Sequence, residues 1–169
     1  MRAAIVPLER SAAPALAALM QLYAHDFSEF LPVAINEQGL FAAPDVEKYF
    51  GARWRHPFLI KADGLLAGFV IVDEKSRFDN VDAPLDVAEF FVLRGHRGAG
   101  VGRRAAEAAF ARFQGRWEVR QSARNAPAIA FWRNVISRYT AGAFEESLCD
   151  DERWHGPVQR FDNRARATG

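Results

Sequence analysis

The stretch from Asp86 to Phe113 constrains the fold most, because a strand pattern, a glycine turn and a helix pattern follow one another without interruption. Residues 86–93 (DVAEFFVL) favour a β-strand, since β-branched and aromatic residues pack well on a pleated sheet. Residues 100–113 favour a helix with one small apolar face, made by Val101, Ala105, Ala108 and Ala109. A strand that leads directly into a helix returns to a parallel neighbour, so this segment predicts an α/β fold.

The rest of the chain adds strands and helices on both sides of this unit. The clearest is a hairpin at residues 57–73, where two apolar runs flank Asp63-Gly64, a dipeptide suited to a type I′ turn. Hydrophobic periodicity predicts the other elements: strands at 3–9 and 117–121, helices at 14–28, 45–50 and 127–137, and a closing hairpin at 143–161 that turns near Asp150-Asp151. The expected fold class is a single-domain mixed β-sheet with flanking helices.

Length and composition exclude several kinds of protein. The 169 residues suit one domain, residues 1–161, followed by a polar tail at 162–169 that we expect to fray. A formal net charge of +1 gives no support for a nucleic-acid partner. No apolar run approaches the roughly 20 residues that span a bilayer, and Glu9 and Arg10 interrupt the N-terminal apolar stretch. We therefore expect a cytoplasmic protein without a membrane partner, and the single Cys149 fits a reducing compartment.

The turn at residues 97–102 (RGAGVG) has the character of an anion-binding site. The first N–H groups of a helix lack internal partners and carry the positive end of its dipole, and glycines let an anion approach the backbone closely. Four arginines crowd this end of the helix: Arg94, Arg97, Arg103 and Arg104. A tight turn with solvated arginines is the alternative, but so many glycines and positive charges favour a phosphate or pyrophosphate ligand.

Two familiar phosphate motifs do not match this turn. A P-loop ends in Gly-Lys-Ser/Thr, and the turn contains no lysine. The dinucleotide fingerprint is G-x-G-x-x-G, whereas Gly98, Gly100 and Gly102 alternate strictly. Residues 121–124 (QSAR) also lack the acidic residue that would contact a ribose.

Two segments together resemble the GNAT superfamily of N-acetyltransferases. The turn RGAGVG is similar to the signature R/Q-x-x-G-x-G/A, and residues 125–132 (NAPAIAFW) are similar to the segment N-x-x-A-x-x-x-Y that follows one strand later. The motifs LYAHDFSEF and EFFVLR also resemble an uncharacterised bacterial branch of predicted acetyltransferases. The resemblance covers residues 86–145 well and the remainder by element order only.

The resemblance implies acetyl-CoA as the cosubstrate and indicates where it binds. Residues 87–93 and 117–121 would be parallel strands that splay apart and admit the pantetheine arm, with a backbone N–H near Val92 as the oxyanion donor. Asn125 would lie near the pantetheine. The implied cofactor-binding set is Phe91, Val92, Arg97, Gly98, Ala99, Gly100, Val101, Gly102, Arg103, Asn125 and Trp132.

The best candidate for a general base is Glu89, because acetylation needs a neutral amine and this carboxylate lies among apolar strand residues. Burial there would raise its pKa towards a useful range. It also aligns with an acidic residue that is common on this strand in the superfamily. The alternative is a structural ion pair with an arginine such as Arg120.

The general acid is harder to assign, because Trp132 stands where the superfamily often has tyrosine, and an indole N–H cannot give up its proton at useful pH. Trp132 also fits a core aromatic. Tyr139 could replace the missing tyrosine only if the helix ended before Arg138, since a straight helix carries it about 10 Å away. Tyr23 and water are the other candidates. Cys149 lies outside both motifs, which favours direct transfer in a ternary complex over an acyl-enzyme.

The acceptor should bind near residues 23–41, where carboxylates alternate with aromatic residues that suit a cationic amine. The expected substrate-binding residues are Tyr23, Asp26 and Glu29, although a charged surface over an apolar base is the other interpretation. The four histidines show no metal-binding spacing, so we expect no metal. The sequence thus predicts an acetyl-CoA-dependent N-acetyltransferase, possible as a homodimer. The alternative is a CoA-binding or sensing module of the same fold without catalysis.

Overall fold

The computed structural model describes residues 2–42, 45–78 and 85–164. Within them, one seven-stranded sheet has the order β1-β2-β3-β4-β5-β7-β6. Its strands are β1 (Ala3–Pro7), β2 (Arg55–Ala62), β3 (Leu65–Asp73), β4 (Leu85–Val92), β5 (Arg116–Arg120), β6 (Glu145–Asp151) and β7 (Trp154–Asp162). Only β4 and β5 pair in parallel, so the predicted mixed sheet with one parallel pair is confirmed.

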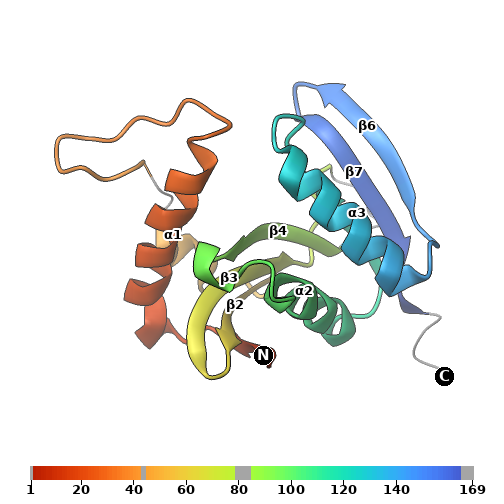
Figure 1. Ribbon diagram of the computed structural model, residues 1–169, viewed down its shortest axis with the longest axis horizontal. Helices are drawn as coiled ribbons and strands as arrows, with labels where there is room; N and C mark the ends of the chain where they lie inside the picture. The colour runs from red at the N-terminus through yellow and green to blue at the C-terminus, as the bar shows by residue number, and fades with distance from the viewer. Residues whose placement is uncertain (1, 43–44, 79–84, 165–169) are drawn as a thin grey trace.

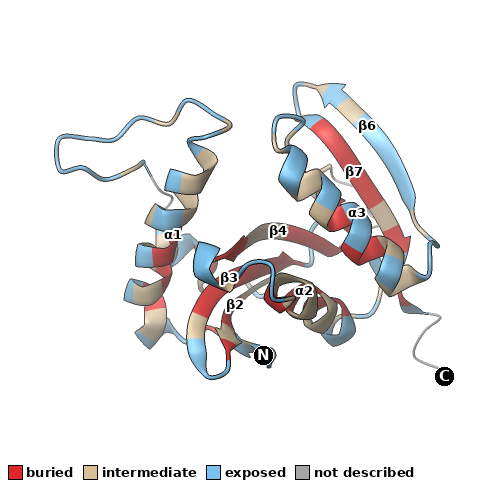
Figure 2. Ribbon diagram, in the orientation of Figure 1, coloured by how far each residue is buried: buried red, intermediate tan, exposed pale blue. Residues whose placement is uncertain are grey.

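Helices cover both faces of this sheet (Figure 1). On one face, α1 (Ala13–Phe27) and the short 3₁₀ turn η2 (Val46–Tyr49) bury a cluster that includes Leu16 and Phe69. On the other face, α2 (Val101–Arg112) and α3 (Ala126–Thr140) bury a larger cluster around Phe110 and Trp117. Buried residues accordingly follow the central strands and the inner sides of the helices (Figure 2).

The two parallel strands separate soon after they meet. Their pairing is limited to Leu85 with Trp117 and Asp86 with Glu118, although β4 continues to Val92. A β-bulge lies in this part of β4. The neighbouring β3 residues Ile71 and Val72 pair with Glu89 and Val87, so Ala88 between them has no partner on β3. The extra residue bends the strand locally. The predicted splay between the two strands is therefore present.

Local signals predicted most element boundaries well. Asp63 and Gly64 both have positive φ, 47° and 85°, as the predicted turn requires. The 45–50 segment forms the 3₁₀ turn η2 rather than a longer helix, and the closing hairpin turns after Asp151, so Asp150 and Asp151 still belong to β6. Among the described helices, none is long and apolar enough to cross a membrane.

Two boundaries differ in ways that matter for the site. Helix α3 continues through Thr140, beyond the predicted end at residue 137, and stops where Ala141 adopts a left-handed conformation. The tail was expected to fray from Asp162, but Asp162 completes β7 and Asn163 is buried. The Asn163 amide donates to the carbonyls of Phe110 and Phe113, which explains its order. Residues 165–169 lie outside the described part of the chain.

Candidate functional site

The glycine turn leaves the first amides of α2 without side-chain partners. Gly98 and Gly100 adopt left-handed φ values of 77° and 78°, and Gly100 is the N-cap of α2. A glycine has no side chain with which to cap the helix, and the first intrahelical bond runs from Arg104 N–H to the Gly100 carbonyl. The amides before Arg104 are therefore available to an anion at the positive end of the helix dipole.

Gly102 has a different role from the two turn glycines. A Cβ at this position would lie 3.2 Å from the ring of Phe131 and 3.6 Å from Val92 Cγ2. The absent side chain therefore lets α2 approach both α3 and the end of β4 closely. This close approach brings the turn, the strand end and α3 into one site.

A cavity of about 850 Å³ lies where these elements meet the end of α1. Its walls come from α1, the end of β4, the glycine turn and one face of α3. The predicted site residues on its walls are Tyr23, Asp26, Glu29, Phe91, Val92, Arg97, Gly98, Gly100, Gly102, Arg103, Asn125 and Trp132. The cavity thus joins the predicted cofactor and acceptor segments, which are far apart in the sequence.

Ala99 and Val101 belong to the same turn but present no side chain to the cavity wall. Ala99 is exposed, and Val101 is fully buried in the core beneath α2. A contact between their backbone N–H groups and a phosphate stays a prediction.

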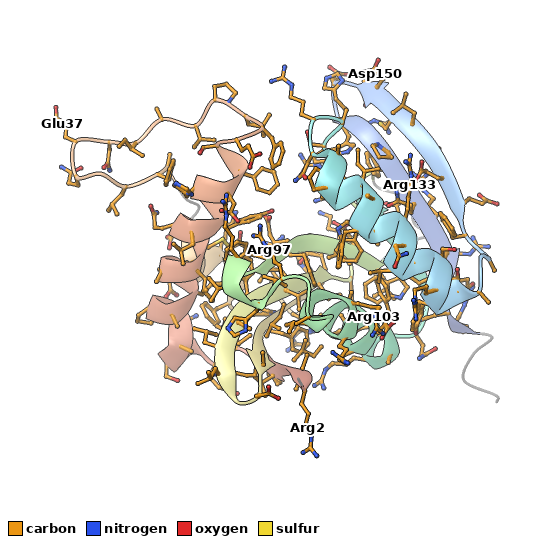
Figure 3. The ribbon with its side chains drawn as sticks, in the orientation of Figure 1. Arg2, Glu37, Arg97, Arg103, Arg133 and Asp150 are labelled. Carbon is orange, nitrogen blue, oxygen red and sulfur yellow. The ribbon has the colours of Figure 1, made fainter. Side chains whose placement is uncertain are left out.

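The arginines of the turn, which the sequence analysis assigns to a phosphate or pyrophosphate ligand, have partners within the protein. Asp26 accepts from Arg94 Nε at 2.9 Å and forms a second ion pair with Arg97, which lies between α1 and the turn (Figure 3). Burial favours the neutral form of Asp26, but the hydrogen bonds from Arg97 and Arg94 outweigh it and lower its pKa. Asp26 therefore anchors α1 to the turn instead of presenting a free charge to an amine.

The next two arginines have partners in α2 itself and in the turn that precedes it. Arg103, at the start of α2 (Figure 3), pairs with Glu107 at 3.1 Å, one helical turn away. Arg104 Nη1 donates to the Ala99 carbonyl at 3.2 Å. Both side chains are partly or fully exposed and can turn towards a ligand at modest cost, since exposed ion pairs contribute little.

The end of β4 presents a backbone amide to the gap between the splayed strands. Leu93 N–H donates to Ala67 in β3, and successive residues of a strand point their N–H groups to opposite edges. Val92 N–H therefore points away from β3, where no β5 residue pairs with it. Arg97 Nε donates to the Val92 carbonyl at 2.8 Å, and Arg97 Cζ lies 5.7 Å from the Phe91 ring centre. Both contacts hold this strand end in place.

Glu89 lies on the α1 face of the sheet and accepts a hydrogen bond from Tyr23 Oη at 2.9 Å. Burial raises the pKa of Glu89, against the opposing effects of the Tyr23 hydrogen bond and nearby positive charges such as Arg120. The alternative ion pair with Arg120 does not form, because Arg120 binds Asp86. Burial also raises the pKa of Asp86 to about 6.

Helix α3 supplies the opposite wall of the cavity. Asn125 caps the helix by accepting from Ala128 N–H at 3.0 Å, which leaves its amide nitrogen for a ligand. Trp132 is buried edge-on against Phe90, with ring centres 5.0 Å apart, so both predicted roles, core aromatic and cavity wall, apply. The sequence reasoning missed further wall residues on this helix: Pro127, Ala128, Phe131, Asn134 and Val135. Their helical spacing would have indicated them.

Tyr139 does not reach the cavity. Its partly buried ring packs against the core beneath α3, with ring centres 5.1 Å from Phe110 and 6.0 Å from Phe161. The prediction that it serves as general acid required the helix to end before Arg138, and α3 instead continues through Thr140. That prediction is wrong, because an unbroken helix carries Tyr139 about two turns from Trp132.

Comparison with known proteins decides the family. The sequence pattern of the acetyltransferase (GNAT) family matches residues 16–135, which is more than half of the chain. The chain belongs to this family. No curated protein matches it closely enough to count as a relative. The part of the chain that the structure describes contains no group of three or more side chains placed to hold a metal ion.

Solved structures agree on the fold. An acetyltransferase from Thermus thermophilus aligns with a TM-score of 0.69 at 18% identity, covering 96% of this chain and 97% of that one. A GNAT-family acetyltransferase from Staphylococcus aureus aligns with a TM-score of 0.63 at 13% identity, covering 95% and 99%. Spermidine N-acetyltransferase from Vibrio cholerae, solved with CoA and spermine, gives 0.60 at 14% identity, covering 94% and 92%.

Proposed function

We propose that the protein transfers an acetyl group from acetyl-CoA directly to an amine, in a ternary complex. The observation that carries this proposal is that one cavity joins the free amides of α2 to the splayed end of β4. The Tyr23–Glu89 pair adjoins the same cavity, through Tyr23. An anion site, a gap for an extended chain and a base candidate thus occur together.

The described residues fit CoA on chemical grounds. The amides between Gly98 and Arg103 suit the pyrophosphate, because they combine unpaired N–H groups with a helix dipole. The gap beside Val92, walled by Asn125 and Trp132, suits the pantetheine arm. Bound there, acetyl-CoA would supply an activated thioester, whose carbonyl carbon an amine can attack.

Two groups of this chain, together with water, would then act on the reaction. The Glu89 carboxylate takes a proton from the ammonium form of the acceptor, which frees the nitrogen lone pair. Val92 N–H donates to the oxygen on which charge develops as the nitrogen–carbon bond forms. The carbon–sulfur bond then breaks and the nitrogen loses its second proton to water. We assign protonation of the thiolate to water as well, because Trp132 and Tyr139 cannot supply the proton.

The acceptor would occupy the wall formed by the end of α1. Tyr23, Phe27 and Phe30 line it together with Glu29, whereas Asp26 is neutralised by its two arginines. Aromatic rings with one carboxylate suit an amine that is cationic before reaction. We also propose a cytoplasmic location, because the proposed reaction uses acetyl-CoA, which is made inside cells.

The second candidate is a CoA-binding module without catalysis, and the position of Tyr139 favours it, since no tyrosine of α3 adjoins the cavity. Release of free CoA thiol from acetyl-CoA, followed with a broad panel of amines, separates the two. Turnover that depends on an amine supports the enzyme. A CoA-induced rise in melting temperature without turnover of any amine supports the module.

A further inference from the structure

One side chain of α1 reaches across the molecule to the proposed base. Tyr23 and Glu89 are 66 residues apart, yet Tyr23 Oη lies 2.9 Å from Glu89 Oε2. Tyr23 is the donor in this contact, and it comes from an element that also lines the acceptor side of the cavity. The contact therefore connects the acceptor wall to the strand that carries the base.

Packing fixes the ring of Tyr23 independently of this hydrogen bond. Three aromatic neighbours surround it, with ring centres 4.7 Å away for Phe27, 5.6 Å for Phe69 and 5.6 Å for Phe91. The first two meet it edge-on, a favoured geometry for aromatic pairs. The hydroxyl is thus held at one place by α1, β3 and β4, and the carboxylate must come to it.

The other polar groups around Glu89 act through charge or are already paired. Arg55 pairs with Asp73, and Arg120 pairs with Asp86. The remaining neighbours from η2 are Lys48 and Tyr49. Tyr49 Oη is buried and makes no hydrogen bond with a described residue, and Lys48 lies over the Tyr49 ring. Tyr23 donates a hydrogen bond of 2.9 Å to the Glu89 carboxylate, whereas Tyr49 interacts with Glu89 through charge and a weaker side-chain contact.

We propose that Tyr23 is a positioning residue, which orients the Glu89 carboxylate and stabilises its charged form for the reaction. This proposal rests on the proposed function, because it concerns the base of that reaction. One oxygen of Glu89 is held by Tyr23, so the other oxygen is left to accept the proton of the amine. This positioning role replaces the expectation that Tyr23 binds the substrate.

The same contact argues against Tyr23 as the general acid. Burial, and then the adjacent Glu89 carboxylate, raise the pKa of Tyr23 well above its usual value. A phenol whose pKa is raised holds its proton more tightly and is a poorer donor to a thiolate. The hydroxyl therefore acts on the base and not on the leaving group.

The test is Tyr23→Phe, which keeps the ring and its packing but removes the donor. The hydrogen bond lowers the pKa of Glu89, so its loss raises that pKa. The acidic limb of the profile of kcat/KM against pH should move to higher pH by about one unit. Below that limb, kcat/KM should fall by about tenfold relative to the unmodified protein, and above it the two proteins should have the same kcat/KM. A limb that stays in place, with any loss of rate equal at every pH, would overturn the proposal.

Tyr49→Phe is the matched control. It makes the same chemical change at a buried tyrosine near Glu89, but Tyr49 makes no hydrogen bond of normal geometry, so only a weaker side-chain contact with that carboxylate is lost. Its acidic limb should therefore move clearly less than that of Tyr23→Phe. Equal shifts in the two variants would assign the effect to general changes in burial and overturn the role of Tyr23.

A direct titration separates this proposal from the proposed function. Carbon-13 NMR of glutamate carboxyl groups reports the Glu89 pKa without turnover, and Glu89→Gln assigns its signal. A higher Glu89 pKa in Tyr23→Phe supports the positioning role even if no amine is acetylated. An unchanged pKa overturns the role even if the protein proves to be an active acetyltransferase.

Discussion

Gly100 offers the sharpest test of where the pyrophosphate binds, because a charge placed there changes one interaction and little else. Its φ of 78° is left-handed, and Asn and Asp tolerate this conformation better than other side chains. An added Cβ would approach Arg104 Nη1 at 3.1 Å, which is the far end of a flexible side chain that can move. Gly100→Asn and Gly100→Asp should therefore each lower the free energy of unfolding by on the order of 1 kcal/mol.

The two variants differ only in charge, so the difference between their affinities for CoA measures the electrostatic effect. If the pyrophosphate lies about 5 Å from the new carboxylate, the repulsion is about 3 kcal/mol per pair of unit charges at an effective dielectric constant of about 20. That repulsion corresponds to a loss of affinity on the order of a hundredfold. Added salt should reduce the difference in CoA affinity between the two variants, because it screens exposed charges.

Calorimetric titration with CoA at two salt concentrations, together with the CoA-induced rise in melting temperature, measures this difference. Gly100→Asn should retain most of the rise, and Gly100→Asp should lose nearly all of it. Chemical unfolding without ligand is the control that both variants fold. If the aspartate variant binds CoA as tightly as the asparagine variant, the pyrophosphate lies elsewhere and the turn is only a connection.

Three further changes probe the remaining assignments. Glu89→Gln should reduce kcat/KM by about 10²-fold or more and keep the CoA-induced rise in melting temperature, since it removes a base and not a binding group; an unfolded variant would point to a structural role. Tyr139→Phe should change turnover less than about twofold, whereas a hundredfold loss would restore it as the general acid. Asp26→Asn should lower the free energy of unfolding by on the order of 1 kcal/mol at pH 7. Because Arg97 and Arg94 lower the pKa of Asp26, the stability that the Asp26 carboxylate contributes is lost as pH falls through that pKa. Urea unfolding should therefore show the two proteins becoming equally stable below about pH 4. A difference in stability that persists in acid would contradict the ion pairs as its cause.

The glycine turn and its helix could be predicted because their signals are local. The alternation of Gly98, Gly100 and Gly102, followed at once by a helix pattern, restricts the backbone at those positions. The structure confirms the helix. It also confirms the splay of the parallel strands, which the resemblance to the superfamily implies and these local signals do not. The turn and its helix depend on neighbouring residues, which a single sequence displays in full.

The partners of the charged groups could not be predicted in the same way. Asp26 seemed free to bind an amine, but α1 ends against the turn and Asp26 pairs there with Arg94 and Arg97. Glu89 was weighed against a pairing with Arg120, whereas its partner is Tyr23. These pairings depend on which helix covers which part of the sheet, and neighbouring residues in the sequence do not indicate that arrangement.

The misassignment of Tyr139 has a local origin. Residues 132, 135, 136 and 139 keep helical spacing, so the apolar stripe of α3 already extended past the predicted end of the helix. The helix ends only where Ala141 turns left-handed, just before Gly142. Reading the stripe to its last member would have placed Tyr139 in the core, where its ring packs against Phe110.

The bulge at Ala88 ties the proposed base to the gap. Leu85, Val87 and Val92 all face the core under α2 and α3. In a regular strand, side chains alternate between the two faces, so Val92 would lie on the face opposite to Leu85 and Val87. The extra residue resolves this conflict and lets Glu89 face α1 and Tyr23. It also bends β4 after the two positions at which it pairs with β5. One inserted residue thus accounts for both the direction of the carboxylate and the place where the strands part, so the base and the thioester site would form together or not at all.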